Sequence, residues 1–461
     1  MNNDNVDQDT GTNNTPQRGR VDLLNSPIMK SLISFTIPLT FSFVVQMLYG
    51  LIDRWFISKL GTEAIAGIGI GEQLNFLIFT LGSGFCMGTG VIVARRIGEK
   101  DRDGADRTAT QAIVFLFATT LILTAGLYVA LPYVLTIFRA NARTTELAHQ
   151  YLTGILFGFA ANLISFQINA IVRSTGNTVY PTIILLSTTL MNAILAPVFI
   201  FYWNLGMFGA GLATALAQLF GALVNISFLL RGKAGIHLRL DGYKPDFHII
   251  SREMSLGLPS SLQMIAVSST RIVIFTLVSG FGTHVVAAYT LGISVDFMVF
   301  MFIFSIGIAV EIATGQNLGA NKPERVFAYH RAGIEALAAI VLVFGIAVYL
   351  FGSHFVSYYT TDASVIREVE GYLHVSVFGY LFFAIGIVSA RVISGAGAAY
   401  QSLFIVAGSI VGIQLPIVII FTKYFGWQQT GIWIGAATGY FFLAMIGLVN
   451  VQGKKWLKVR V

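Results

Sequence analysis

Long hydrophobic runs dominate this chain, and short polar stretches separate them. Mostly apolar runs of about 18 or more residues recur about twelve times, and each is long enough for a helix that crosses a bilayer. The pattern therefore predicts an all-α integral membrane protein. The twelve predicted transmembrane helices lie near residues 32–56, 64–93, 110–137, 149–172, 180–202, 208–230, 255–280, 285–315, 333–354, 370–390, 400–422 and 430–450.

The two halves of the chain repeat one pattern at a constant offset of 221 residues, the difference between Pro259 and Pro38. Each half contains six predicted helices, an even number, so the halves share one orientation and form two pseudo-symmetric six-helix bundles. Such a duplication is typical of transporters with a solute pathway between the bundles. The other matched pairs are Gly61-Thr62 and Gly282-Thr283, Ala66 and Ala287, Gly71 and Gly292, Phe76 and Phe297, Gly98 and Gly319, and Gly176 and Gly397.

Polar segments divide the chain into five parts. We expect a disordered cytoplasmic tail over 1–29, a first lobe over 30–230, a cytoplasmic linker over 231–254, a second lobe over 255–450, and a basic cytoplasmic C-terminus over 451–461. The first twenty residues contain no apolar stretch of the signal-peptide kind, so the first membrane helix is predicted to direct insertion.

The chain has a net charge of +7, and the distribution of its basic residues indicates how it is oriented in the membrane. With the N-terminus placed inside, 22 of the 29 Lys and Arg residues fall in the tail, the even-numbered loops and the C-terminus. This follows the rule that cytoplasmic loops are basic, so we expect no nucleic-acid partner. The sequence predicts a multi-pass protein of the plasma (inner) membrane with both termini in the cytoplasm.

Residue types that perform catalysis or bind metals show no pattern here. Cys86 is the single cysteine, and the seven histidines show no ligand spacing, so the sequence predicts no enzyme, no metal site and no cofactor. The Gly-rich basic stretch over 94–106 could be mistaken for a phosphate-binding loop. It lacks the P-loop spacing and follows no strand, so we interpret it as a solvated helix exit.

Several segments together resemble the multidrug and toxic compound extrusion (MATE) family, and the DinF-like branch within it. The resemblance covers residues 30–450 and implies a V-shaped pair of six-helix lobes. It also implies an antiporter that exports amphipathic, often cationic, compounds in exchange for protons or sodium ions. We expect the protein to be a monomer with membrane lipids around it. The segments are IPLTFSFVVQMLYGLIDRWFISKLGTEAIAGIG, ARRIGEKD, VRSTGNTVYP, LGMFGAGLAT, GQNLGANKPERV and ISGAGAAYQS.

Asp53 is the main candidate for ion coupling. An ionisable group within a membrane is costly, so it is a functional candidate by default. Gln46, Tyr49 and Asp53 stand at i, i+3 and i+7 and share one helical face, which could line a substrate cavity. Asp53 matches the aspartate that the resembled branch uses for proton or cation coupling. The alternative is that a basic side chain holds Asp53 in a permanent ion pair.

Asn192 and Thr214 match two other polar positions of the family's N-lobe cluster. Each could be an ion ligand or could only join two helices by hydrogen bonds. Ala196 stands where the branch carries a second aspartate, which weakens the case for a sodium site more than for a proton site.

The remaining membrane charges are predicted to pair or to face the cavity. Arg54 and Glu72 lie at similar depth, ~10 Å below one surface, so they could form an ion pair, and Glu72 could also line the cavity. Arg271 and Asp296 also share a depth, which predicts a structural ion pair. Glu311 could contact substrate or reach water.

Other classes of protein fit less well. A lipid-linked oligosaccharide or lipid II flippase of the same superfamily is the main alternative, but those proteins tend to carry extra helices and a strongly cationic cavity. An integral-membrane enzyme would need clustered acids and histidines at a membrane face. A major-facilitator transporter would carry a different motif after its second helix. The substrate and the choice between proton and sodium remain open at this stage.

Overall fold

The structure is a computed structural model that describes residues 19–138 and 140–459. Most of the predicted tail over 1–29 therefore lies outside the described residues. The first half contains α1 (Ile28–Ser58), α2 (Thr62–Gly98), α3 (Arg102–Thr136), α4 (Ala142–Ser174), α5 (Val179–Pro197) with a π-helical extension η1 (Val198–Tyr202), and α6 (Gly206–Leu230).

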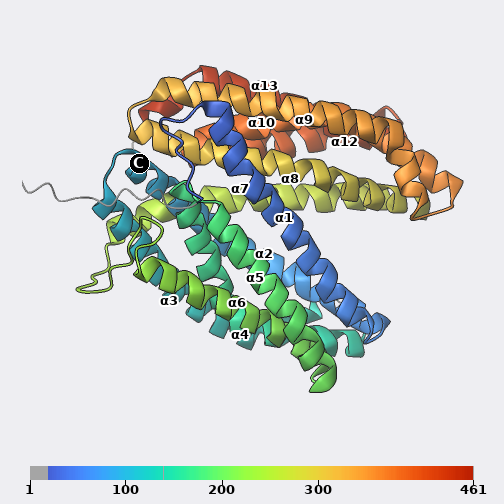
Figure 1. Cartoon of the computed structure of the whole chain (residues 1–461). Helices are drawn as coiled ribbons and strands as arrows, with labels where there is room; N and C mark the ends of the chain where they lie inside the picture. Colours follow the sequence, from blue (N-terminus) through green and yellow to red (C-terminus); the bar gives the residue numbers. More distant parts are fainter. Residues whose placement is uncertain (1–18, 139, 460–461) are drawn as a thin grey trace, which may run out of the picture.

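The second half repeats this order (Figure 1). Within the described residues, twelve helical segments are long and apolar enough to cross a membrane, which confirms the predicted number. The elements are α7 (Phe247–Ser279), α8 (Thr283–Gly319), α9 (Pro323–Ser357), α10 (Ala363–Gly395), then α11 (Ala399–Ala407), η2 (Gly408–Gln414), α12 (Leu415–Ile419) and η3 (Ile420–Tyr424), which together form one span, and α13 (Gln428–Gln452) and η4 (Lys455–Lys458).

Several helices extend beyond the apolar runs that predicted them. α7 begins at Phe247, where the hydrophobic pattern predicted a start near 255, and α2 continues to Gly98 beyond the predicted end near 93. Hydropathy locates only the part of a helix that lies in lipid, whereas backbone hydrogen bonds continue into the polar region. At the start of α7, the Asp246 side chain accepts hydrogen bonds from the amides of His248 and Ile249, which sets the helix start in polar sequence.

The helices form two lobes that diverge as a V in Figure 1. In the N-lobe α4 packs against α2 and α6, and in the C-lobe α10 packs against α8 and α13 in the same way. Gly71 lies against the Tyr151 ring, and Gly292 lies against the Tyr372 ring at the matching place. Equivalent contacts in both lobes show that the 221-residue offset is a structural repeat.

α1 crosses from one lobe to the other (Figure 1). Phe35 and Leu39, in its first half, are buried in a hydrophobic core made largely of α8–α10 residues, whereas Ile57 near its end is buried in the N-lobe. Pro38 lies between these parts and provides no N–H to the preceding turn, which permits a bend. Pro259 occupies the corresponding place in α7.

The lobes meet where the linker and the loops after α2 and α8 lie, which we name the linker end. The opposite end, with the turns at 59–61 and 280–282, is named the hairpin end. At the linker end α2 and α8 cross closely: an added Cβ at Gly98 would lie 2.0 Å from the Gln316 carbonyl oxygen, and one at Gly319 would lie 2.2 Å from that of Arg95. The lobes therefore touch at the linker end and spread toward the hairpin end (Figure 1).

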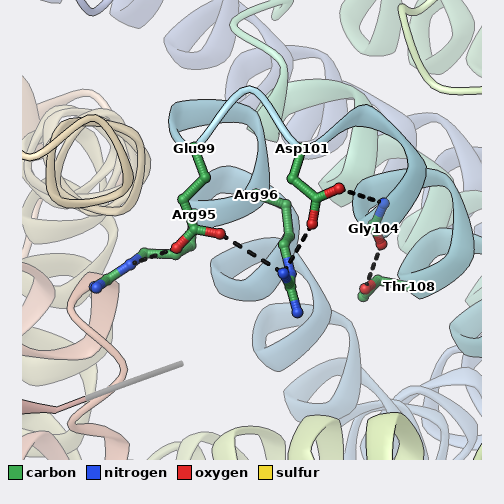
Figure 2. A network of polar contacts seen from close by, with 6 residues as sticks. All are labelled: Arg95, Arg96, Glu99, Asp101, Gly104 and Thr108. Atoms are coloured by element: carbon green, nitrogen blue, oxygen red, sulfur yellow. Dashed lines mark hydrogen bonds and ion pairs between the residues drawn. The ribbon is translucent and has the colours of Figure 1, made fainter.

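The α2–α3 turn carries the basic stretch that we interpreted as a helix exit (Figure 2). Arg96 Nη1 lies 2.8 Å from Asp101 Oδ2, and the same carboxylate accepts a hydrogen bond from the Gly104 amide at the start of α3. Arg95 pairs with Glu99 at 3.4 Å. The charges of Arg95 and Arg96 are thus paired within the turn, which agrees with a helix exit.

Candidate functional site

Three of the predicted polar residues meet inside the N-lobe. Thr214 Oγ1 of α6 donates to Asp53 Oδ2 of α1 at 3.3 Å, and Asn192 Nδ2 of α5 donates to Thr214 Oγ1 at 3.1 Å. Asp53 is only 4% exposed and Asn192 only 1% exposed. The three helices thus bring a carboxylate, a hydroxyl and an amide into one connected group, which we name the Asp53 cluster.

The Asp53 carboxylate has no basic partner in the part of the chain that the structure describes. The ion pairs among the described residues do not include Asp53, so the alternative in which a cation holds it permanently is absent from this structure. No hydrogen-bond donor among residues 19–138 and 140–459 reaches its buried Oδ1 atom, and the same holds for Asn192 Oδ1. A buried carboxylate without a full set of donors is costly, so the cluster suits a group that binds a proton or a cation.

Two tyrosines, Tyr49 and Tyr151, lie near this carboxylate. The buried hydroxyl of Tyr49 lies near Asp53, Thr214 and Gln218, so the predicted face of α1 does point inward at this height. Tyr151 of α4 is 3% exposed and also lies close to Asp53. Tyr151 and Gln218 were not among the predicted site residues. Tyr151 matches Tyr372 at the repeat offset of 221 residues, and this match could have indicated Tyr151 from the sequence.

Gln46 lies apart from the other polar residues predicted on this face of α1. Its side chain is exposed, whereas Asp53 on the same helical face is buried. The two residues are about 10 Å apart along the helix, at 1.5 Å per residue, so one face can pass from an open region into packed protein. Gln46 is therefore not part of the Asp53 cluster, and its place in a substrate cavity stays a prediction.

The predicted pair between Arg54 and Glu72 forms. Arg54 Nη2 lies 2.5 Å from Glu72 Oε2, and Nε lies 3.2 Å from Oε1, a two-pronged contact between α1 and α2. The side chains are 59% and 32% exposed, so water or lipid headgroups reach the pair. The Glu72 carboxylate is thus ion-paired with Arg54 near the Asp53 cluster. The predicted role of Glu72 in contacting substrate stays a prediction.

The predicted ion pair between Arg271 and Asp296 is wrong. Asp296 is buried and accepts hydrogen bonds from the hydroxyls of Tyr372 and Tyr380, the latter at 2.6 Å. Arg271 lies on an exposed part of α7 and is not among the ion-paired residues of the described chain. Equal depth brought the two charges into one region, but it could not show that tyrosine hydroxyls, and not Arg271, contact the Asp296 carboxylate.

Glu311 has partners within the C-lobe. Arg391 Nη1 donates to its Oε2 at 2.9 Å, and Ser394 Oγ donates to its Oε1 at 2.5 Å. Glu311 is 7% exposed, so it does not reach bulk water in this conformation. A cavity of about 20 Å³, the space of one water molecule, lies next to this pair and is lined by Met87, Ser260, Gln263, Met264, Arg391, Ser394 and Ser402.

The described residues contain no group of three or more metal-ligating side chains. A surface groove of about 490 Å³ lies between α10 and α13, lined largely by apolar side chains that include Phe378 and Phe441. None of the residues of the Asp53 cluster lines it.

The match to a family model decides the identification. The MatE model matches residues 38–198 and again 259–420, once in each lobe and together more than half of the chain. This chain belongs to the MatE family. It is therefore a transporter and not an enzyme, and the two matches begin 221 residues apart, as the repeat does.

Curated relatives match over nearly their full length. The chain is 24% identical to the probable multidrug resistance protein YoeA of Bacillus subtilis, over 93% of this chain and 95% of the relative. It is 26% identical to the probable multidrug resistance protein NorM of Thermotoga maritima, with 94% of each covered, and 25% identical to the multidrug export protein MepA of Staphylococcus aureus, with 87% and 89% covered.

Solved structures share the fold. A MOP superfamily transporter from Pyrococcus furiosus, described as having a binding pocket of reverse polarity, matches with a TM-score of 0.89 at 23% identity, covering 96% of this chain and 99% of that one. An outward-facing multidrug resistance MATE transporter matches with a TM-score of 0.88 at 24% identity, covering 96% and 99%. The V-shaped two-lobe architecture expected from the resemblance is thus confirmed.

Proposed function

We propose that this MatE protein is a cation-coupled antiporter that exports amphipathic, often cationic, compounds by alternating access. The observation that carries the proposal is the Asp53 cluster, in which a buried carboxylate has no basic partner among the described residues and one of its oxygens has no hydrogen-bond donor there. The names of the multidrug export relatives support the class of substrate.

The membrane orientation follows from charge. The linker end carries the basic loops, and basic loops face the cytoplasm, so we place this end and both termini inside a plasma membrane. The lobes are then closed toward the cytoplasm and spread toward the outside. In this state Asp53 would receive a proton from outside, and closure of the hairpin end would carry the proton inward.

We favour the proton over sodium as the coupling ion. Sodium prefers several oxygen ligands, and the described cluster supplies one carboxylate, with buried Ala196 where the resembled branch has a second acid. A single carboxylate with an accepting oxygen is sufficient for one proton. Protonation would remove the charge and strengthen the packing of α1 in the N-lobe, while a cationic substrate would favour the ionised form.

The test is dye transport in proteoliposomes. We expect the purified protein to drive ethidium against its concentration when a proton gradient is imposed, and to fail with liposomes that lack a gradient. A sodium gradient alone should give no accumulation. Transport of a lipid-linked oligosaccharide analogue without ethidium transport would contradict the proposal and favour the flippase alternative.

A further inference from the structure

A short segment before α1 touches both lobes at the linker end. We name residues 19–26 the strap. On the N-lobe side, the Val21 amide donates to the Gly176 carbonyl at 2.9 Å, and Arg20 Nε donates to the Thr175 carbonyl at 2.8 Å. Arg20 also forms an isolated β-bridge with Asn177. These contacts attach the strap to the turn between α4 and α5.

Gly176 is required for this attachment. Its φ of +95° lies in the left-handed region, which side chains with a Cβ rarely adopt. A Cβ at this position would also lie 2.5 Å from the Val21 carbonyl oxygen, which is backbone and cannot turn away. The turn therefore accepts the strap only while the residue is glycine.

The next residues of the strap attach to the C-lobe. Leu23 is 1% exposed and belongs to the C-lobe core. Its carbonyl accepts hydrogen bonds from Asn317 Nδ2 at 3.1 Å and from the Tyr329 hydroxyl at 3.0 Å, while Arg325 Nη2 donates to the Ser26 carbonyl at 2.9 Å. The contacts come from α8 and α9, on the opposite lobe from Gly176.

Only two peptide steps separate the two attachments. Val21 and Leu23 can span at most ~7 Å when the chain is fully extended, so the strap cannot stretch while the lobes move apart. The part of the linker that precedes α7, residues 231–246, differs from the strap. Its hydrogen bonds to Asp106 and Gln111 are contacts with α3, so they stay within the N-lobe. The strap is thus a direct tie between the lobes at the end that must open.

We propose that the strap is a clasp that holds the lobes closed at the linker end, and that its N-lobe attachment must release before this end opens. The proposal rests on the alternating access proposed above. The N-lobe attachment is the weaker one, because the C-lobe attachment includes buried Leu23 and continues into the first half of α1, where Phe35 is buried in the same core. We therefore expect the strap to move with the C-lobe.

The test is the distance between the lobes in full-length protein. Spin labels would be placed at Arg231→Cys and Gln452→Cys, exposed repeat-equivalent positions at the ends of α6 and α13, in a Cys86→Ser background. Double electron–electron resonance then gives the ratio of open to closed linker ends. Gly176→Ala should raise this ratio roughly two- to tenfold, the change expected from the loss of about one net hydrogen bond.

Gly397→Ala is the matched control. Gly397 occupies the repeat-equivalent turn of the C-lobe with a φ of +90°, so its substitution introduces the same backbone strain away from the attachment of the strap. The ratio should stay at the wild-type value in this variant. Equal ratios in Gly176→Ala and Gly397→Ala would overturn the proposal.

A second pair of variants decides the question if Gly176→Ala does not fold. Arg20→Ala removes the hydrogen bond to Thr175, and Lys30→Ala removes an exposed cation just beyond the strap. The ratio should rise only in Arg20→Ala, and a wild-type ratio there would refute the clasp. The measurement of the distances between the lobes needs no substrate and no ion gradient. The clasp proposal can therefore be confirmed or refuted even if the protein does not transport ethidium.

Discussion

At the linker end, Gly98 and Gly319 let α2 and α8 cross so closely that neither position has room for a Cβ. An alanine at Gly98 would place its Cβ 2.0 Å from the Gln316 carbonyl oxygen, and neither helix backbone can turn aside. Overpacking of this kind typically costs 1–3 kcal/mol. The contact joins the two lobes, so the cost applies only while the linker end is closed.

The same substitution should therefore favour the open linker end about five- to 150-fold, since each 1.4 kcal/mol is a factor of ten. The spin-label pair described above measures this ratio. Gly319→Ala should act in the same way, because its added Cβ would lie 2.2 Å from the Arg95 carbonyl oxygen in the reciprocal contact.

Gly126→Ala in α3 serves as the control, because an added Cβ there would meet no described atom within 4 Å beyond its own stretch of helix. It should leave the ratio unchanged and raise the stability of its helix by up to about 1 kcal/mol. A wild-type ratio in both Gly98→Ala and Gly319→Ala would show that the lobes do not separate along this crossing.

Three further predictions concern charged residues. Arg391→Ala should lower the free energy of unfolding by about 3–5 kcal/mol, because it leaves Glu311 buried without its cation. Thermal unfolding of the variant measures this change, and a clearly smaller decrease in the free energy of unfolding would argue against the pairing. Glu253→Gln should keep or raise the melting temperature, because Glu253 is 0% exposed and has no ion-pair partner in the described chain; a clear drop would contradict this. Burial acts to raise the pKa of Asp22, but hydrogen bonds from residues 24–25 outweigh it and hold the pKa below its ordinary value. The turn in the strap should thus be fully formed at neutral pH and weaken only as pH falls through that lowered pKa, so the turn itself should add no change to the lobe distances between about pH 8 and 5.

The repeat spacing and the hydropathy pattern were sufficient to predict the architecture. The twelve spans and the two equivalent lobes follow from period and length, and the convergence of Asp53, Asn192 and Thr214 agrees with the family resemblance. The pair between Arg54 and Glu72 was predictable because both lie near a short turn between consecutive helices, where depth alone restricts the partners.

Contacts between distant helices could not be predicted in this way. Depth gave Asp296 a height that Arg271 shares, but the direction of each side chain depends on how α7, α8 and α10 are rotated, and Tyr372 and Tyr380 supply the donors. The strap gave no sequence signal either, because its attachments use backbone groups of ordinary residues. Such groups acquire partners only when the lobes assemble.

The role of Asp53 as the coupling group is the central claim, and one comparison tests it most directly. Wild type, Asp53→Asn and the exposed-site control Asp103→Asn would be reconstituted, and ethidium exchange without a gradient would be measured beside accumulation driven by a proton gradient. We predict that Asp53→Asn keeps the exchange but loses the driven accumulation, while the control keeps both. Driven accumulation at the wild-type level in Asp53→Asn would contradict the account.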